Sequence, residues 1–199
     1  GISITNNIVP NGNLTLNQSG GSASHSGAIT GPGGITKTGT GALTLAGIQT
    51  YDGVTTVAEG TLAVSSDFSL GSTVGNTIVA DGATLDLQGV TTSEAITISG
   101  TGVNGAGALR NSNQYARLNG RVTLAADSTI GSGLWAMELR GGIDGNHDLT
   151  IDAASIVDIM SDLAIDGDLT INGTGIVVLE RDNSFTGNVT VNGGRLASG

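Results

Sequence analysis

The sequence predicts an all-β chain that winds into a parallel β-helix, or β-solenoid, with about 20 residues per coil. Three observations predict it. Short segments alternating apolar and polar residues recur along the chain. The 199 residues include 34 glycines but only 2 prolines, which marks frequent tight turns. Finally, DLTIDAASIVDI (148–159) matches DLTINGTGIVVL (168–179) twenty residues later, a spacing that fits three short strands and their turns.

The predicted strands all carry the alternation that sends one side chain inward and the next outward. In chain order they are NLTL (13–16), ALTL (42–45), TLAV (61–64), TLDL (84–87), AITI (95–98), RVTL (121–124), DLTI (148–151), DLTI (168–171) and NVTV (188–191). Stacked coils would then align the inward residues in aliphatic columns. These residues are Ile35, Leu43, Leu45, Val57, Leu62, Leu85, Leu87, Ile96, Ile98, Leu149, Ile151, Leu169 and Ile171.

Helix is disfavoured by the abundance of Gly, Thr, Asn and β-branched residues. The best helical candidate is SIVDIMSDLAI (155–165), but its alternation and its register with residues 175–185 favour strand. With about ten coils at a spacing of roughly 4.8 Å, the chain forms a short rod.

A second internal repeat connects the two halves of the chain. Residues 33–63 match residues 167–197 without a gap, with 12 of 31 positions identical, including Gly53 with Gly187. We therefore expect a single β-solenoid domain over 1–199, with N-terminal coils in 1–32 and the two best-matching repeats in 33–66 and 167–199.

The segment GGITKTGTGALTLAGIQTYDGVTTVAEGTLAV (33–64) resembles the autotransporter-associated β-strand repeat, also called the passenger-associated transport repeat, of bacterial secreted surface proteins. The resemblance extends from about residue 30 to the C-terminus. It implies a right-handed β-helical passenger or adhesin, secreted or displayed on the cell surface. It brings no catalytic residues with it.

Composition narrows the range of partners. The net charge is −10 and Lys37 is the one lysine among seven basic residues, so a phosphate backbone would be repelled and nucleic acid is not expected. The chain has no cysteine, which removes disulfides and thiolate metal sites. No apolar run approaches the roughly 18 residues of a membrane span, and the first residues lack a signal-peptide pattern.

Two motifs resemble ligand-binding sequences. GTGVNG (100–105) fits the dinucleotide-binding pattern, but no amphipathic helix follows it, so a turn between coils is the better interpretation. DGNHD (144–148) resembles the start of an EF-hand loop, but Leu149 replaces the required Gly and Ser155 the required Glu. We expect no cofactor.

The segment 144–182 holds nine acids against Arg181 alone, which suggests adventitious binding of a divalent cation. The candidate ligands are Asp144, Asp148, Asp166 and Asp168. A solvated acidic face is the simpler alternative.

Enzymes that act on polysaccharides also use β-helices, so the fold alone does not exclude catalysis. Such sites need acids beside basic groups, and Arg110, Arg117 and Arg121 have few acids near them in sequence. Segment 103–143 has four Arg against Asp127 and Glu138, a charge of +2, and could contact the acidic segment of a neighbouring molecule. Scattered surface charges without a partner are the alternative.

Both ends of the sequence, GISITNNIVPNG and GNVTVNGGRLASG, predict strands rather than capping helices. We therefore predict a non-enzymatic extracellular rod that spaces, adheres or assembles head-to-tail. Its partners would be a second copy, end to end or side by side, adjacent coils of a longer chain, or a host or matrix surface. The alternative is a polysaccharide-binding or polysaccharide-degrading β-helix protein, although five aromatic residues offer little stacking surface.

Overall fold

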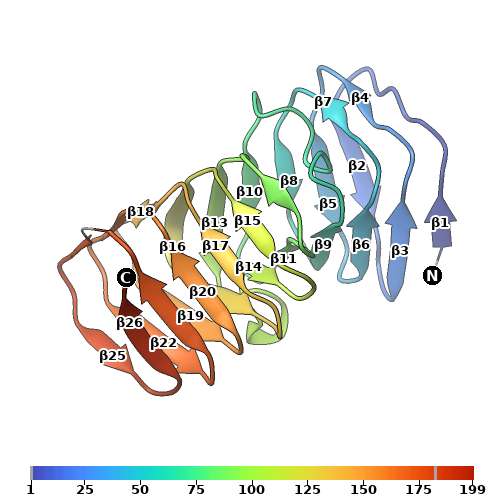
Figure 1. The fold of residues 1–199 in the computed structure, drawn as a ribbon. Helices are drawn as coiled ribbons and strands as arrows, with labels where there is room; N and C mark the ends of the chain where they lie inside the picture. The colour runs from blue at the N-terminus through green and yellow to red at the C-terminus, as the bar shows by residue number, and fades with distance from the viewer. Residues whose placement is uncertain (1, 182) are drawn as a thin grey trace.

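In a computed structural model that describes residues 2–181 and 183–199, the chain winds as a stack of coils whose two termini lie at opposite ends (Figure 1). Neighbouring coils pair as parallel strands, as where Leu169 pairs with Leu149. The strands of the coils form three faces, which we number 1 to 3 in the order in which a coil visits them, and most coils contribute a strand to each face. The prediction of a parallel β-helix with about 20 residues per coil is confirmed.

Face 1 and face 2 form one 18-stranded sheet, because β16 turns the corner from one to the other. Face 1 consists of β2 (Leu14–Asn17), β5 (Ile35–Thr38), β8 (Thr55–Val57), β10 (Thr77–Val79), β13 (Ile96–Gly100), the first part of β16 (Val122–Ser132), β18 (Ile143–Gly145), β21 (Leu163–Ile165) and β24 (Ser184–Phe185). Face 2 consists of β1 (Ile2–Ile4), β3 (Ser22–His25), β6 (Ala42–Leu45), β9 (Thr61–Val64), β11 (Thr84–Asp86), β14 (Leu109–Asn111), the last part of β16, β19 (Leu149–Ala153), β22 (Leu169–Gly173) and β25 (Val189–Val191). We number the coils 1 to 10 by these ten face-2 strands.

Face 3 is less regular than the other two. It consists of β4 (Thr30–Gly31), β7 (Thr50–Tyr51), β12 (Thr91–Thr92), β15 (Ala116–Leu118), β17 (Met137–Leu139), β20 (Ile156–Ile159), β23 (Ile176–Leu179) and β26 (Arg195–Ser198). The two-stranded pair β4–β7 is separate from the six-stranded sheet that begins at β12. Because residues 155–165 contribute β20 and β21, the strand prediction for this segment is confirmed.

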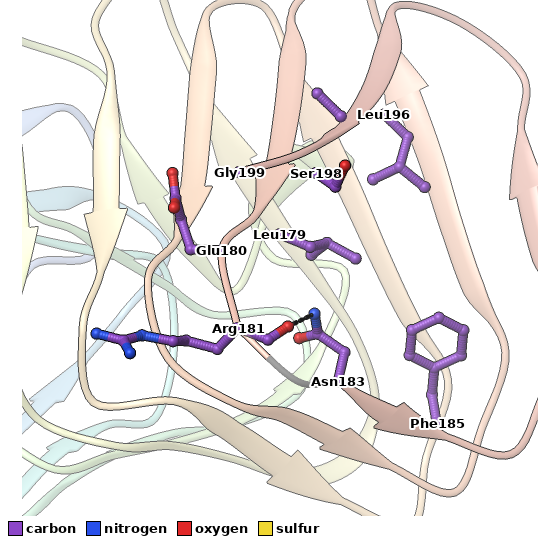
Figure 2. A pocket seen from close by; sticks show the side chains of 9 residues that line it. Leu179, Glu180, Arg181, Asn183, Phe185, Leu196, Ser198 and Gly199 are labelled. Carbon is purple, nitrogen blue, oxygen red and sulfur yellow. Dashed lines mark hydrogen bonds between the residues drawn. The ribbon is translucent and has the colours of Figure 1, made fainter.

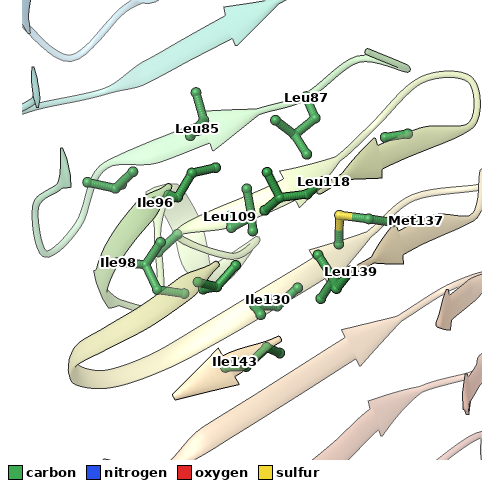
Figure 3. Packing of buried hydrophobic residues seen from close by; sticks show 14 of the residues in the cluster. Leu85, Leu87, Ile96, Ile98, Leu109, Leu118, Ile130, Met137, Leu139 and Ile143 are labelled. Carbon is green, nitrogen blue, oxygen red and sulfur yellow. The ribbon is translucent and has the colours of Figure 1, made fainter. Parts of the chain in front are cut away.

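The core is the space enclosed by the three faces, and it is filled by the predicted aliphatic columns (Figure 3). All thirteen predicted inward residues are buried. In Figure 3, Leu85, Leu109 and Ile130 come from successive face-2 strands that pair in register, and Leu118 and Leu139 approach them from face 3. Each coil therefore repeats the packing of the one before it.

Helical structure in the described residues is limited to a 3-10 turn, Val103–Gly105, at the corner between face 1 and face 2. This turn lies within GTGVNG, so the motif is a turn as expected, but it joins two faces within coil 6 rather than two coils. The part of the chain that the structure covers contains no helix long and apolar enough to cross a membrane.

Candidate functional site

Asp148 and Asp168 lie on a ladder that connects coils at the corner before face 2. Oδ1 of Asp127 accepts a hydrogen bond from the Asp148 N–H (3.1 Å), Oδ1 of Asp148 accepts one from the Asp168 N–H (2.8 Å), and Oδ1 of Asp168 accepts one from the Asn188 N–H (2.7 Å). Each carboxylate therefore satisfies a corner amide that has no partner in its own coil. This contact gives both aspartates a structural role.

The other two metal candidates have different surroundings. Asp144 pairs through Oδ2 with Nη1 of Arg121 at 3.0 Å. Asp166 is exposed, and its backbone N–H donates to Gly145 O at 3.1 Å. The four candidates are thus distributed over a ladder, an ion pair and an open surface. Among the described residues, no three His, Asp or Glu side chains gather in an arrangement that could hold a metal ion. Asp182, another acid of this segment, lies outside the described residues.

Few acids lie near the central arginines in sequence, yet each arginine has an acidic partner in the structure, and in three of the four pairs that partner comes from a neighbouring coil. The pairs are Arg110–Asp86 (3.7 Å), Arg117–Glu138 (3.2 Å), Arg140–Glu138 (2.6 Å) and Arg121–Asp144 (3.0 Å). The arginine side chains of these pairs are partly exposed, so each pair contributes little to stability. The pairing nevertheless means that the positive charge of segment 103–143 is largely matched within the chain.

Polar side chains that were not predicted interrupt the core near coils 3 to 5. The Tyr51 hydroxyl shares a hydrogen bond of 2.6 Å with Thr55 Oγ1, and Thr77 Oγ1 donates to Glu94 Oε1 at 3.0 Å. Thr55 and Thr77 pair in register on face 1, where neighbouring strands carry Ile, Val or Leu. All four side chains are buried, so each hydroxyl needs the partner it has.

Burial raises the pKa of Glu94 to about 7, while its hydrogen bond from Thr77 opposes the rise. Burial likewise raises the pKa of Tyr51. A carboxyl group with a pKa near neutrality is suited to proton transfer. Glu94 is only 2% exposed, however, so a substrate could reach it only if the corner rearranged.

Substitution of Glu94 by glutamine tests this environment. Because the folded pKa lies above the usual 4.5, the folded state holds the proton more tightly than the unfolded state does. Stability should therefore be full below pH 4.5, fall as the pH rises from 4.5 to 7, and stay level above 7. At pH 8 the E94Q variant should be more stable than the wild type by about 3 kcal/mol, and at pH 4 it should have no such advantage.

Urea denaturation followed by circular dichroism at pH 4, 6 and 8 would measure this dependence. Asp166→Asn, which neutralises an exposed carboxylate, is the matched control and should change stability little at any pH. An E94Q advantage that is equal at pH 4 and pH 8 would contradict the assignment.

His25 occupies an inward position between Ile4 and Leu45 on face 2. It is 1% exposed, and neither ring nitrogen has a hydrogen-bond partner. Burial lowers its pKa, so the imidazole is neutral and packs as an apolar group. His147 lies far from it, 3.6 Å from Asp127. The structure thus brings the two histidines into no common site.

Each end of the stack carries a depression where the terminal coil exposes its inner surface. At the C-terminal end it has a volume of about 680 Å³, and Leu179, Phe185 and Leu196 form its apolar part (Figure 2). At the N-terminal end a depression of about 260 Å³ is lined by Ile4, Leu16 and His25, among others. Both depressions are openings of the solenoid core rather than pockets built for a small ligand.

Comparison with known proteins agrees with this architecture. The family model of the passenger-associated transport repeat matches residues 35–64 and 169–197. The adhesin BmaC autotransporter of Brucella suis biovar 1 (strain 1330) is 32% identical over 139 residues, which is 64% of this chain and 4% of that protein. No solved structure shows significant similarity to the chain.

The two matched segments have the same succession of strands, but the first begins on face 1 and the second on face 2. Residues 35–64 supply β5 to β9, and residues 169–197 supply β22 to β25 and most of β26. Both lie within the segments that the internal repeat singled out. The predicted resemblance is therefore confirmed: two segments of this parallel β-solenoid match the model of the passenger-associated transport repeat.

Proposed function

We propose that this chain is a non-enzymatic, extracellular β-solenoid of an adhesive surface protein, and that its terminal coils stack on further coils. Those coils belong to the same polypeptide where it continues, or to a second copy joined head-to-tail. The repeat family and the adhesin relative support secretion or surface display. Host or matrix surfaces are the proposed targets of adhesion.

The proposal of head-to-tail stacking rests mainly on the exposed backbone of coil 10. Asn192 N–H donates to Ile171 O in coil 9 at 2.9 Å. Backbone groups alternate in direction along a strand, so the N–H groups of Val189 and Val191 point away from coil 9. They form a free edge of the kind that pairs with another strand.

The side chains at the two ends are compatible with continued stacking. Val191 ends the face-2 column that Ile2 begins, and both are exposed, at 47% and 70%. Asn188 occupies the next position of the aspartate ladder, so its Oδ1 is placed to accept an amide from a following coil. A coil that stacked here would extend both the column and the ladder.

A double substitution, Val189→Pro with Val191→Pro, would test end-to-end stacking of the 199-residue chain. Proline removes the two outward N–H groups and leaves the bonds of Thr190 and Asn192 to coil 9 in place. Negative-stain electron microscopy at high protein concentration should show end-to-end particles for the wild type and single short rods for the double variant.

The matched control is Val189→Ala with Val191→Ala, which keeps both donors and should still assemble. Single short rods of the wild type at all concentrations would contradict stacking between copies. Adhesion is tested separately with protein-coated beads on immobilised matrix proteins. Turnover of acidic polysaccharides by the purified chain would contradict the non-enzymatic assignment.

A further inference from the structure

The edge between face 2 and face 3 carries exposed apolar side chains on several coils. We name it the apolar edge and define it by Ile48, Phe68, Tyr115, Leu134 and Trp135. These five are 60%, 60%, 36%, 86% and 50% exposed. The chain has five aromatic residues, and the three exposed ones, Phe68, Tyr115 and Trp135, all lie here. Exposed apolar side chains gathered along one line of a soluble protein indicate a contact surface.

Backbone bonds show that these residues occupy successive coils. Gln49 N–H, next to Ile48 in coil 3, donates to Phe68 O in coil 4 at 2.9 Å. Asn111 Nδ2 in coil 6 donates to Gln114 O (2.7 Å) and to Ala136 O in coil 7 (3.0 Å). The buried Asn111 side chain thus fixes the corners that carry Tyr115 and Trp135, so this part of the edge is preorganised.

Coil 5 divides the apolar edge into two matching halves. Its corner has Gly89, whose N–H donates to Asn111 Oδ1 at 3.2 Å, and its large apolar side chains, Leu87 and Val90, are buried. One coil before it lies Phe68, and one coil after it lies Tyr115. Two coils before it lies Ile48, and two coils after it lie Leu134 and Trp135. Rings and aliphatic groups are therefore placed at equal distances on either side of Gly89.

Charges beside the apolar edge follow the same arrangement. Asp67 adjoins Phe68 and is exposed, with Oδ1 accepting the Thr91 N–H at 2.7 Å. Arg117 lies over the Tyr115 ring, 4.6 Å from its centroid, and its side chain is 42% exposed. Arg117 and Arg140 share Glu138, so this group of side chains on coils 6 and 7 keeps one net positive charge, opposite in sign to Asp67 on coil 4.

We propose that a second copy of this chain binds the apolar edge side by side in antiparallel orientation, about a two-fold axis through coil 5. This axis places Phe68 against Tyr115 of the other copy, Ile48 against Leu134 and Trp135, and Asp67 near Arg117. A parallel pair would instead place Asp67 against Asp67 and Arg117 against Arg117, which is repulsive. Trp, Tyr and Arg are the residues that contribute most at such contacts.

The contact is small, since the apolar edge spans five coils, or about 19 Å. Interfaces of this size fall in the weak class, so we expect a dissociation constant between about a micromolar and a millimolar. Such a contact suits cohesion between many rods displayed on one or two surfaces, where effective concentration is high. It uses the side of the rod and is independent of stacking at the ends.

Sedimentation velocity over a wide concentration range, in the Val189→Pro/Val191→Pro background, would isolate this contact from end-to-end assembly. We expect a concentration-dependent dimer and a parallel blue shift of the fluorescence of Trp135, the chain's single tryptophan. Phe68→Ser with Tyr115→Ser should weaken association at least tenfold. Val54→Ser with Val74→Ser, two exposed valines at the corner between faces 3 and 1, should leave it unchanged.

Because the chain has no cysteine, single-cysteine variants report the orientation. A mixture of Phe68→Cys and Tyr115→Cys proteins should form a disulfide-linked heterodimer. Phe68→Cys alone should link slowly, because its copies lie about two coils apart along the rod, beyond disulfide reach. Faster linking of Phe68→Cys alone, or a monomer at every concentration, would overturn the proposal. Quenching of Trp135 by oligosaccharides without dimerisation would assign the apolar edge to a glycan instead.

Discussion

Replacing Lys37 by alanine is expected to destabilise coils 3 and 4 by about 4 kcal/mol. Lys37 is fully buried at an inward position of β5, in the column between Leu16 and Val57. Its Nζ donates to Thr38 O (3.0 Å), Gly39 O (2.6 Å) and Glu59 O (2.9 Å). The first two carbonyls belong to one corner and the third to the corner of the next coil. One ammonium group therefore ties two corners together.

The K37A variant leaves three carbonyl groups without this donor and opens a cavity in the column. Burial lowers the pKa of Lys37, while the nearby Glu59 opposes this effect. Burying the charged ammonium therefore costs free energy, which its three hydrogen bonds offset. Lys37→Met, which restores the volume but not the donors, should be destabilised less than K37A. The difference between the two variants measures the cavity.

Urea denaturation followed by circular dichroism would rank these variants, and amide hydrogen exchange of Ala58, whose N–H donates to Lys37 O at 2.9 Å, would localise the effect. Val57→Ala is the matched control, since it removes volume from the same column without removing a hydrogen bond. A Lys37→Met variant as stable as the wild type would show that the three bonds do no more than offset the burial of the charge.

The repeating part of the fold could be predicted from the sequence because segments that alternate apolar and polar residues recur about once per coil. Alternation placed Leu43, Leu62 and Leu85 inward, and register pairing stacks them in that order. The same alternation places Lys37 inward beside Ile35. The carbonyl groups contributed by Gly39 and by the next coil explain how its charged group can be buried.

Contacts between coils were the part that sequence reasoning missed. Arg117 and its ion-pair partner Glu138 are 21 residues apart in sequence, and Arg110 and its partner Asp86 are 24 residues apart. These separations differ because corner lengths vary, so a fixed period of 20 does not find the pairs. A coil-by-coil alignment that allowed corners of different length would also have brought Phe68, Tyr115 and Trp135 to one edge.

Substitution of Gly53 by alanine should cost about 3 to 4 kcal/mol, because the corners of successive coils touch through their backbones. Gly53 lies between face 3 and face 1, where its N–H donates to Gly33 O at 3.3 Å. A Cβ at Gly53 would overlap the backbone nitrogen of Gly34 and approach its Cα to 2.7 Å. Backbone atoms cannot rotate away as a side chain can, so coils 3 and 4 would have to separate.

The G53A change also tests the meaning of the internal repeat. Gly187 matches Gly53 at the offset of 134 residues, and a Cβ there would overlap the carbonyl oxygen of Gly167. Because coil 10 has a neighbouring coil on one side within this chain, it can shift outward, and Gly187→Ala should cost less than G53A. Gly12→Ala is the matched control, since a Cβ there meets no atom within 4 Å.

Thermal and urea denaturation of the three variants would give the ranking G53A, Gly187→Ala, Gly12→Ala, from most to least destabilised. Equal stability of G53A and Gly12→Ala would mean that the corner tolerates a side chain, and the glycine match between the repeats would then need another cause. The expected ranking would show that the corners need glycine because stacked coils approach too closely for a Cβ. The same close stacking builds the rod.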